Sequence, residues 1–142
     1  MRTYVGSQFG RHVVMHLGKG EQVLESIQSE IKRLNIRTGI VTSGIGSARK
    51  IVYHRIGNLA DDPLNIFVTK EGPMEIGAIQ GIIIDGEPHL HIVCYGEDGA
   101  FSGHLEPGCE IQYLAEISII ELTDADLTRR IDEFGISYID KR

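Results

Sequence analysis

The sequence predicts an α+β domain of sandwich-like type, with one main helix and a largely antiparallel sheet. Two observations support this fold class. A single segment has apolar residues at helical spacing, whereas nearly every other apolar segment is short and rich in β-branched residues, as strands are. Turn signals separate these segments at hairpin spacing, which favours antiparallel neighbours. We expect one domain over residues 1–142, because this length suits a single core.

The predicted helix spans Gln22–Leu34. Its apolar residues recur every three or four positions and therefore share one stripe of the helix surface. Gly18 and Gly20 precede this segment, and Asn35 stands where the helix is expected to end. The apolar stripe consists of Val23, Leu24, Ile27, Ile31 and Leu34.

Strands are predicted for most of the remaining chain. The segments are Arg2–Val5, His12–Leu17, Gly39–Ser43, Ile51–Arg55, Asn65–Lys70, Glu75–Ile84, Leu90–Tyr95, Glu110–Leu122 and Gly135–Ile139. Turn signals between them include Gly57-Asn58, Gly72-Pro73, Asp85-Gly86 and Pro107-Gly108. The strand Glu110–Leu122 is long and rich in isoleucine, so we expect part of it to lie against another subunit.

Composition restricts the classes of partner. The chain has 14 Lys and Arg against 20 Asp and Glu, a net charge of −6, which argues against strong binding to nucleic-acid phosphates. No apolar run approaches the roughly 20 residues of a membrane span, and the N-terminus lacks the apolar core of a signal peptide. We therefore expect a cytoplasmic protein without a membrane partner. Cys94 and Cys109 form no Cys-x-x-Cys pair and are expected to be reduced.

Three histidines stand close together around one predicted hairpin. His89 and His91 are two residues apart on a strand, so their side chains share a face, and Cys94 faces the opposite side. A hairpin loop centred between residues 97 and 98 would place His91 opposite His104. A loop centred on Asp98-Gly99 would instead pair His104 with Val93, still on the histidine face and diagonal to His91.

Three imidazoles on one face are typical of a metal site with one coordination position left open. Zinc is the leading candidate, because three protein ligands plus a free position are its catalytic pattern. We expect one zinc per chain on His89, His91 and His104. The alternative is a polar strand that faces solvent and binds no metal. His12, His16 and His54 do not belong to this group by spacing.

A glycine-containing segment, Thr42–Ser47, follows a short apolar strand. A dinucleotide-binding loop would need a third glycine and then a helix, and neither follows here. Gly44 and Gly46, together with Ser43, are therefore expected to form a tight turn or a close backbone approach at a subunit contact or pocket wall.

Glu116 is a carboxylate within an otherwise apolar predicted strand. If its side chain faced inward it would need a partner, and a metal-bound histidine could supply one. The more common arrangement is a side chain on the solvent-facing side of the strand.

In several motifs the sequence resembles the plants and prokaryotes conserved (PPC) domain. The resemblance extends from about residue 12 to residue 122. Its motifs are His89-Leu90-His91, Gly103-His104-Leu105, Pro107-Gly108-Cys109, Ala115-Glu116-Ile117, Ser43-Gly44-Ile45-Gly46-Ser47 and Glu71-Gly72-Pro73-Met74-Glu75-Ile76.

The resemblance implies a homotrimer, a sandwich-like fold, and zinc on His89, His91 and His104. Prokaryotic members are described as DNA-binding or regulatory proteins, a description taken from plant relatives with an AT-hook, whose Arg-Gly-Arg-Pro core is absent here. A plant loop of sequence Gly-Arg-Phe-Glu-Ile-Leu contacts transcription factors. This chain keeps only the glycine, glutamate and isoleucine of that loop, as Gly72, Glu75 and Ile76; Gly72 and Glu75 are candidates for an interface.

The PPC fold is also similar to that of acetolactate decarboxylase, a zinc lyase with three histidine ligands. This second resemblance implies an alternative function, a zinc-dependent lyase or hydrolase that acts on a small acid. The small-molecule ligand would then bind at the metal.

Overall fold

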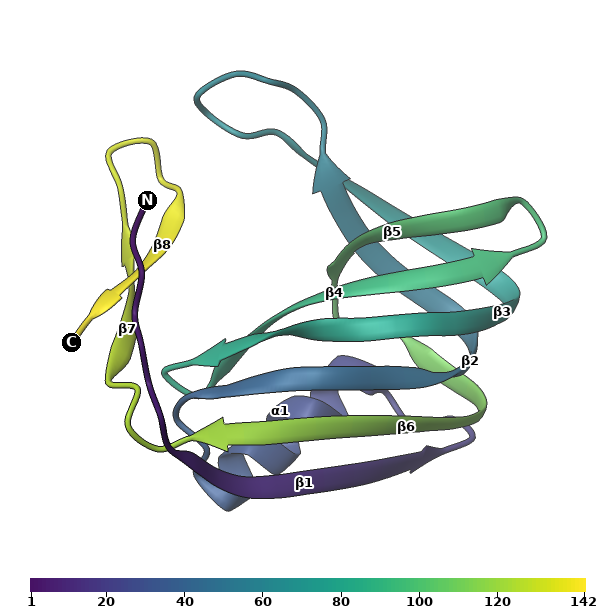
Figure 1. Cartoon of the computed structure of the whole chain (residues 1–142). Helices are drawn as coiled ribbons and strands as arrows, with labels where there is room; N and C mark the ends of the chain where they lie inside the picture. The colour runs from purple at the N-terminus through teal and green to yellow at the C-terminus, as the bar shows by residue number, and fades with distance from the viewer.

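A computed structural model describes residues 1–142 as a six-stranded sheet with one helix on one face, plus a separate two-stranded hairpin (Figure 1). Every strand pairing is antiparallel, as predicted. The elements are β1 (Phe9–Gly18), α1 (Val23–Leu34), β2 (Gly39–Ile56), β3 (Asn65–Ile84), β4 (Glu87–Gly96), β5 (Gly99–Leu105), β6 (Glu110–Leu122), β7 (Leu127–Ile131) and β8 (Ser137–Lys141).

The helix α1 confirms the sequence prediction to within one residue. Val23, Leu24, Ile27 and Ile31 are buried against the sheet. The helix ends at Asn35, which adopts the left-handed conformation that terminates many helices. With 12 residues, α1 is too short to cross a bilayer, and it is the only α-helix in the structure.

The strand order of the main sheet is β1-β6-β2-β3-β4-β5, and the end of β5 also pairs with β2. This additional pairing curls the sheet, because the last strand, β5, returns to pair with β2, and β3 and β4 lie between them in the strand order. The core fills the concave side and the space under α1. Its largest buried side chains include Leu17, Ile27, Ile51, Ile79, Ile83, Ile92 and Ile111.

The predicted turn at Gly72-Pro73 is wrong, and so is the tight-turn alternative for Thr42–Ser47, because the chain continues as strand through both segments. Thr42–Ser47 lies inside β2, and Gly72-Pro73 lies inside β3. Register shifts beside both segments show that β-bulges absorb the irregular residues. Gly72 has a φ of 130°, a conformation that favours glycine. Both bulged segments thus have the residue composition of loops although they lie within strands.

Three smaller differences concern the ends of the chain. The predicted strand Arg2–Val5 is wrong, because residues 1–8 contain no regular secondary structure, and Tyr4 contacts β8 through its side-chain hydroxyl. The strand β7 was not predicted, because its central residues, Thr128, Arg129 and Arg130, are polar. The last strand begins two residues later than the predicted Gly135–Ile139.

The face of the sheet turned away from α1, here called the outer face, has no helix over it (Figure 1). His89, Ile82, Ile40 and Ile120 lie in one row across four strands of this face. Several apolar side chains are exposed there: Val14, Ile45, Ile82, Val93 and Leu114.

The hairpin of β7 and β8 stands beside the β3–β4 turn, at the end of the sheet where both chain termini lie (Figure 1). Asp85 in that turn accepts hydrogen bonds from the Thr128 hydroxyl at 2.7 Å and the Arg129 backbone N–H at 3.1 Å. Asp85 also forms an ion pair with Arg142. One carboxylate therefore holds both strands of the hairpin against the main sheet.

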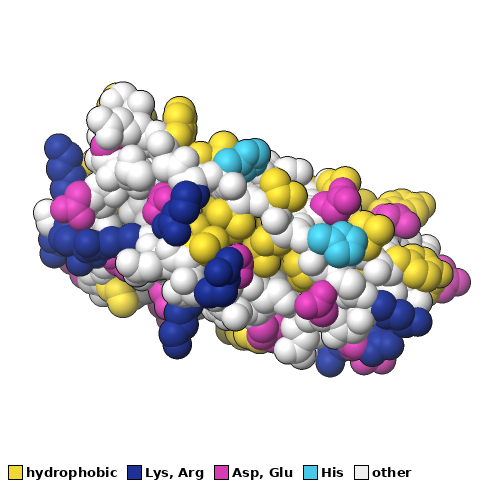
Figure 2. Space-filling model, turned by 90° about the horizontal axis from the view of Figure 1, so that it is seen from below, with side chains coloured by type: hydrophobic (Ala, Val, Ile, Leu, Met, Phe, Trp, Pro, Cys, Tyr) yellow, Lys and Arg dark blue, Asp and Glu magenta, His cyan; other side chains and the backbone are white.

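Charged side chains of both signs are mixed over the surface. On the side seen from below, Lys and Arg lie beside Asp and Glu and form no continuous basic stripe (Figure 2). Several arginines are paired with carboxylates within 4 Å, among them Arg11 with Glu121 and Arg33 with Glu30. This distribution agrees with the net charge of −6.

Candidate metal centre

The strands β4 and β5 bring three predicted site residues together. His91 pairs directly with His104, so the hairpin loop is centred between residues 97 and 98, and the alternative centred on Asp98-Gly99 is wrong. His89 lies two residues before His91 on the same face. The ring centroids are 5.6 Å apart for His89 and His91, 4.8 Å for His89 and His104, and 5.8 Å for His91 and His104.

One ring nitrogen from each of the three histidines lies within 4.8 Å of the others. Two nitrogens bound to the same zinc ion can be at most about 4.2 Å apart, since each bond is about 2.1 Å. Small side-chain rotations would close this difference. His89 and His91 are open to solvent on one side, which leaves space for a fourth ligand.

The protonation states of these histidines suit a metal. Removal of the His104 ring from water lowers its pKa to about 4, and the nearby His54 and His89 would add repulsion to a protonated ring. The pKa of His89 is also lowered, first by desolvation and then by the charge of Arg129. Both rings are therefore neutral at pH 7, the form that binds metals.

A fourth histidine, His54, contacts this group, although the sequence analysis placed it outside. His54 on β2 pairs with His104 on β5, and their rings stack with centroids 4.4 Å apart. Its Nδ1 lies 2.5 Å from a carboxylate oxygen of Glu106. His54, His104 and Glu106 also place one ligand atom each within 4.8 Å of one another.

Spacing along the chain could not indicate His54, because its contact with His104 depends on the curled sheet. His104 follows His54 by 50 positions in the chain, and no local pattern predicts that β2 pairs with β5. For Glu106 a local signal does exist, because it follows His104 by two residues and alternation along a strand would place both side chains on one face.

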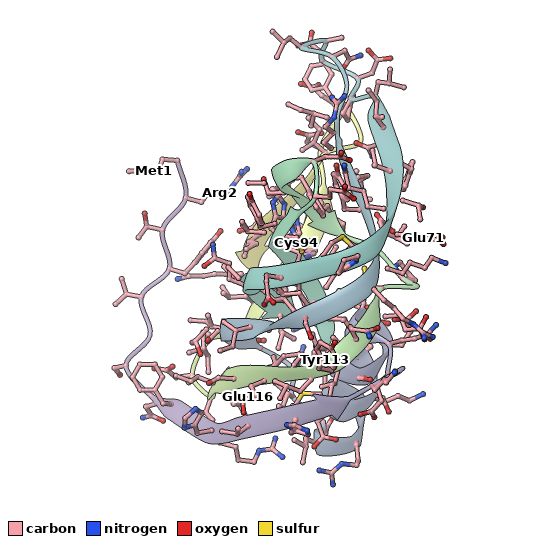
Figure 3. The ribbon with its side chains drawn as sticks, turned by 90° about the vertical axis from the view of Figure 1, so that its right-hand side faces the viewer. Met1, Arg2, Glu71, Cys94, Tyr113 and Glu116 are labelled. Atoms are coloured by element: carbon pink, nitrogen blue, oxygen red, sulfur yellow. The ribbon has the colours of Figure 1, made fainter.

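Glu116 does not contact the histidines. Its side chain is exposed on β6, and it lies opposite His16 on one side and Ile45 on the other. Figure 3 shows Glu116 at the lower part of the sheet, with β2 and β3 between it and the strand β4. Three strand spacings amount to about 14 Å. Glu116 thus has the solvent-facing arrangement that was expected to be the more common one, at a distance from the three-histidine cluster.

The predicted glycine positions pack strands together within one subunit. A Cβ atom on Gly44 would lie 2.5 Å from Cβ of Ile79, and one on Gly46 would lie 2.3 Å from the backbone oxygen of Leu114. The expected close backbone approach is therefore present, but in a strand. Ser43 is exposed beside them.

Gly72 and Glu75 line a different cavity, of about 870 Å³, beside the bulges in the middle of β2 and β3. Its lining also includes Arg49, Glu110 and Tyr95, and it contains no histidine. These two residues thus belong to a separate surface.

Neither cysteine has the properties of a nucleophile or a metal ligand. Cys94 is buried on the core side of β4, as predicted from its alternation with the histidines. Burial raises the pKa of Cys94 to about 12 and that of Cys109 to about 11. Both thiols therefore stay protonated at neutral pH.

A cleft of about 710 Å³ lies next to the histidines on the outer face. Its lining comes from β2, β3, β4 and the C-terminal hairpin: Ile40, Val41, Thr42, Gln80, Gly81, Ile82, His89, His91, Arg129 and Ile139. The open side of the histidine group is thus part of a concave site with apolar walls and a few polar groups, as small-molecule sites are.

Fold and site together define a class of small proteins in which a curled antiparallel sheet, backed by one helix, presents a three-histidine cluster. This chain belongs to the Plants and Prokaryotes Conserved domain family, abbreviated PCC or PPC, whose family model matches residues 4–123.

Solved structures agree with this assignment. A plant- and prokaryote-conserved protein from Pyrococcus horikoshii is 29% identical, with a TM-score of 0.79 over 100% of this chain and 99% of its own. A candidate DNA-binding protein from Bacteroides thetaiotaomicron is 20% identical, with a TM-score of 0.77 over 98% of each chain. A metal-containing protein from Archaeoglobus fulgidus is 19% identical, with a TM-score of 0.75 over 95% of each chain.

Among curated proteins, a bifunctional protein GlmU from a Synechococcus strain is 25% identical over 119 residues. These residues are 83% of this chain but only 18% of the relative. The chain thus spans about a fifth of that curated relative.

Proposed function

We propose that this PPC-domain protein binds one zinc ion per chain through His89, His91 and His104, and that the whole chain, residues 1–142, forms one domain. The observation that supports the metal site is the convergence of three ring nitrogens within 4.8 Å on one face of a hairpin. The lowered pKa values of His104 and His89 also support the metal site, because a metal binds the neutral form of histidine. A zinc ion held by three histidines keeps one position open and acts there as a Lewis acid.

Metal analysis of purified variants tests this proposal. We expect about one zinc per chain in the wild-type protein, and less than a tenth of that in His91→Ala, since a two-histidine site binds zinc far more weakly. The matched control is His16→Ala, which removes an exposed histidine of the same face near Glu116. Full zinc content in His91→Ala would contradict the proposed ligand set.

We further propose that the protein is a homotrimer whose contacts involve the outer face. Support comes from the PPC family and from exposed apolar side chains on that face, including Val14 at 74%, Ile45 at 49% and Leu114 at 41% exposure. Two of these residues lie on β1 and β2, and Leu114 lies on the isoleucine-rich strand β6.

Light scattering tests the trimer. The wild-type mass should be about three times 15.7 kDa, and Ile45→Glu should dissociate the assembly, because it would bury a charge without a partner. Ile131→Glu serves as the control, since Ile131 is exposed (72%) but lies on the separate hairpin. A stable wild-type monomer would refute the proposal.

DNA binding and regulation form a second candidate function. Two solved neighbours are described as candidate DNA-binding proteins. The net charge of −6 and the mixed surface charges weigh against it. A gel-shift series at increasing salt tests DNA binding. A DNA-binding protein would give a shift at low salt that disappears as the salt concentration rises, because phosphate contacts weaken steeply with salt. Absence of a shift at low salt would count against DNA binding.

The remaining alternative is a zinc-dependent lyase or hydrolase for a small acid. The observation that favours it is the 710 Å³ cleft at the open side of the histidines. The cleft is open to solvent on one side, and its apolar walls with a few polar groups suit a small ligand that lies against the metal. Incubation of zinc-loaded protein with a panel of small hydroxy acids and keto acids tests this alternative, with His91→Ala as the inactive control.

A further inference from the structure

We propose that the cleft beside the histidines binds a small carboxylate, with Arg129 of the C-terminal hairpin as the residue that recognises the carboxylate group. This inference rests on the proposed metal site and names the ligand class for it. The residue lies after position 123 and therefore outside the residues that the PPC family model matches.

The first argument is the charge of the cleft. The lining contains two histidines, one arginine, Gln80 and Thr42, but no aspartate or glutamate. In a chain with net charge −6, a cleft with only neutral and positive side chains is unusual. A metal ion on the histidines would make it more positive still. An anion is the complementary ligand.

The second argument is the environment of Arg129. Its side chain is half-buried, yet the guanidinium takes part in none of the ion pairs or side-chain hydrogen bonds of the structure. Desolvation lowers its pKa with no carboxylate to compensate. A partly buried arginine usually has an acidic partner, because an uncompensated charge is costly to bury. Its partner is therefore expected from outside the chain.

The third argument is that the hairpin is held in place. The backbone N–H of Arg129 donates to Asp85 at 3.1 Å, and its neighbour Thr128 donates to the same carboxylate at 2.7 Å. Arg129 pairs with Ile139, and both side chains line the cleft. Arg129 and His89 line the same cleft. The arginine is thus fixed over the cleft rather than free in solvent.

The ligand class follows from these groups. A guanidinium binds a carboxylate through two parallel hydrogen bonds. The apolar side chains of Ile40, Ile82 and Ile139 suit a short hydrocarbon body attached to that carboxylate. Gln80 and Thr42 offer further polar contacts. Inorganic phosphate would leave the apolar walls in contact with water.

Isovalerate (3-methylbutanoate) is a suitable probe, with isovaleramide as its neutral isostere and inorganic phosphate as a second anion. Binding is followed on zinc-loaded protein by calorimetry and by the Nε–Hε resonance of Arg129 in NMR spectra. We expect isovalerate to bind, isovaleramide to bind at least tenfold more weakly, and phosphate to bind more weakly than isovalerate. Tighter binding of phosphate than of isovalerate would overturn the carboxylate assignment.

Variants identify the residue. Arg129→Gln should weaken isovalerate binding about 10- to 100-fold, the range for loss of a charge-assisted pair of hydrogen bonds. Arg129→Lys keeps the charge but loses the two parallel hydrogen bonds of the guanidinium. Its affinity for isovalerate should lie between those of the wild type and Arg129→Gln. The matched control is Arg130→Gln, since Arg130 is the next residue, is exposed, and pairs with Asp140. Equal affinities in the wild type, Arg129→Gln and Arg130→Gln would overturn the inference.

The same samples separate this inference from the metal proposal. Zinc content is measured first: absence of zinc refutes the metal site, and an isovalerate-dependent shift of the Arg129 resonance in that metal-free protein would still support the anion site. Normal zinc content without any such shift would overturn the anion site alone. If a short DNA duplex, and not isovalerate, bound in an Arg129-dependent way, the arginine would be a phosphate contact and the inference wrong.

Discussion

At the scale of single residues, the histidine group shows what alternation along a strand can establish. His89 and His91 share a face because side chains of a strand alternate, and the pairing of His91 with His104 needs only the correct hairpin centre. Both facts are local and were predictable. The position of His54 was not, because its contact with His104 depends on a pairing between strands distant in the sequence.

The first residue-scale prediction concerns pH. The pKa of His104 is about 4 in the folded protein, against 6.5 for an unperturbed histidine. Between these values the unfolded chain takes up a proton that the folded chain does not, so the free energy of unfolding falls as the pH decreases. The contribution of the neutral His104 ring to the free energy of unfolding is fully present above pH 6.5 and fully lost below pH 4.

Denaturant titrations of metal-free protein at pH 7.5 and pH 4.5 measure this effect. In His104→Asn, which cannot titrate in this range, we expect a smaller difference between the two pH values. An unchanged difference would show that other groups cause the pH dependence.

A second residue-scale prediction concerns Gly44, whose missing side chain lets β2 and β3 approach. Gly44→Ala should lower the free energy of unfolding by about 1–3 kcal/mol, because the added methyl would overlap Ile79. Gly77→Ala is the matched control: its added methyl would have only one neighbour, the Val93 oxygen at 3.8 Å. Chemical denaturation of both variants checks the contrast, and equal losses would contradict the packing argument.

At the scale of elements, the helix and most strands were predictable because each has a strong local period. α1 and β6 match their predicted ranges almost to the residue. The errors occur where the local signal and the tertiary pairing disagree. Gly72-Pro73 has the composition of a turn, but pairing with β2 keeps β3 continuous through a bulge. Polar β7 has no apolar alternation and depends on Asp85 instead.

This dependence gives an element-scale prediction. Asp85→Ala should release the hairpin of β7 and β8, because it removes two hydrogen bonds and the ion pair with Arg142. A loss of about 1–3 kcal/mol in local stability is expected for such charge-assisted bonds. Hydrogen exchange should become faster in residues 127–141 and stay slow in β3, β4 and β6. Uniformly faster exchange would mean that the hairpin is not a separate unit.

At the scale of the whole molecule, the curled sheet explains why the site lies where it does. One face is covered by α1 and forms the core, so the functional side chains can gather only on the outer face or at its edges. The hairpin of β7 and β8 then adds Arg129 and Ile139 to a cleft whose other walls come from β2, β3 and β4. The proposed metal ligands and the proposed anion contact thus come from separate parts of the chain, which the hydrogen bonds of Asp85 to β7 hold together.

The central claim is that three histidines of one hairpin hold a metal ion with an open position. X-ray absorption at the zinc edge of the loaded wild-type protein tests it most directly. The account predicts three imidazole nitrogens at about 2.0–2.1 Å and one exchangeable oxygen ligand, with the imidazole contribution reduced in His91→Ala. Four protein ligands, a sulfur shell near 2.3 Å, or a spectrum identical to that of zinc in buffer would contradict it.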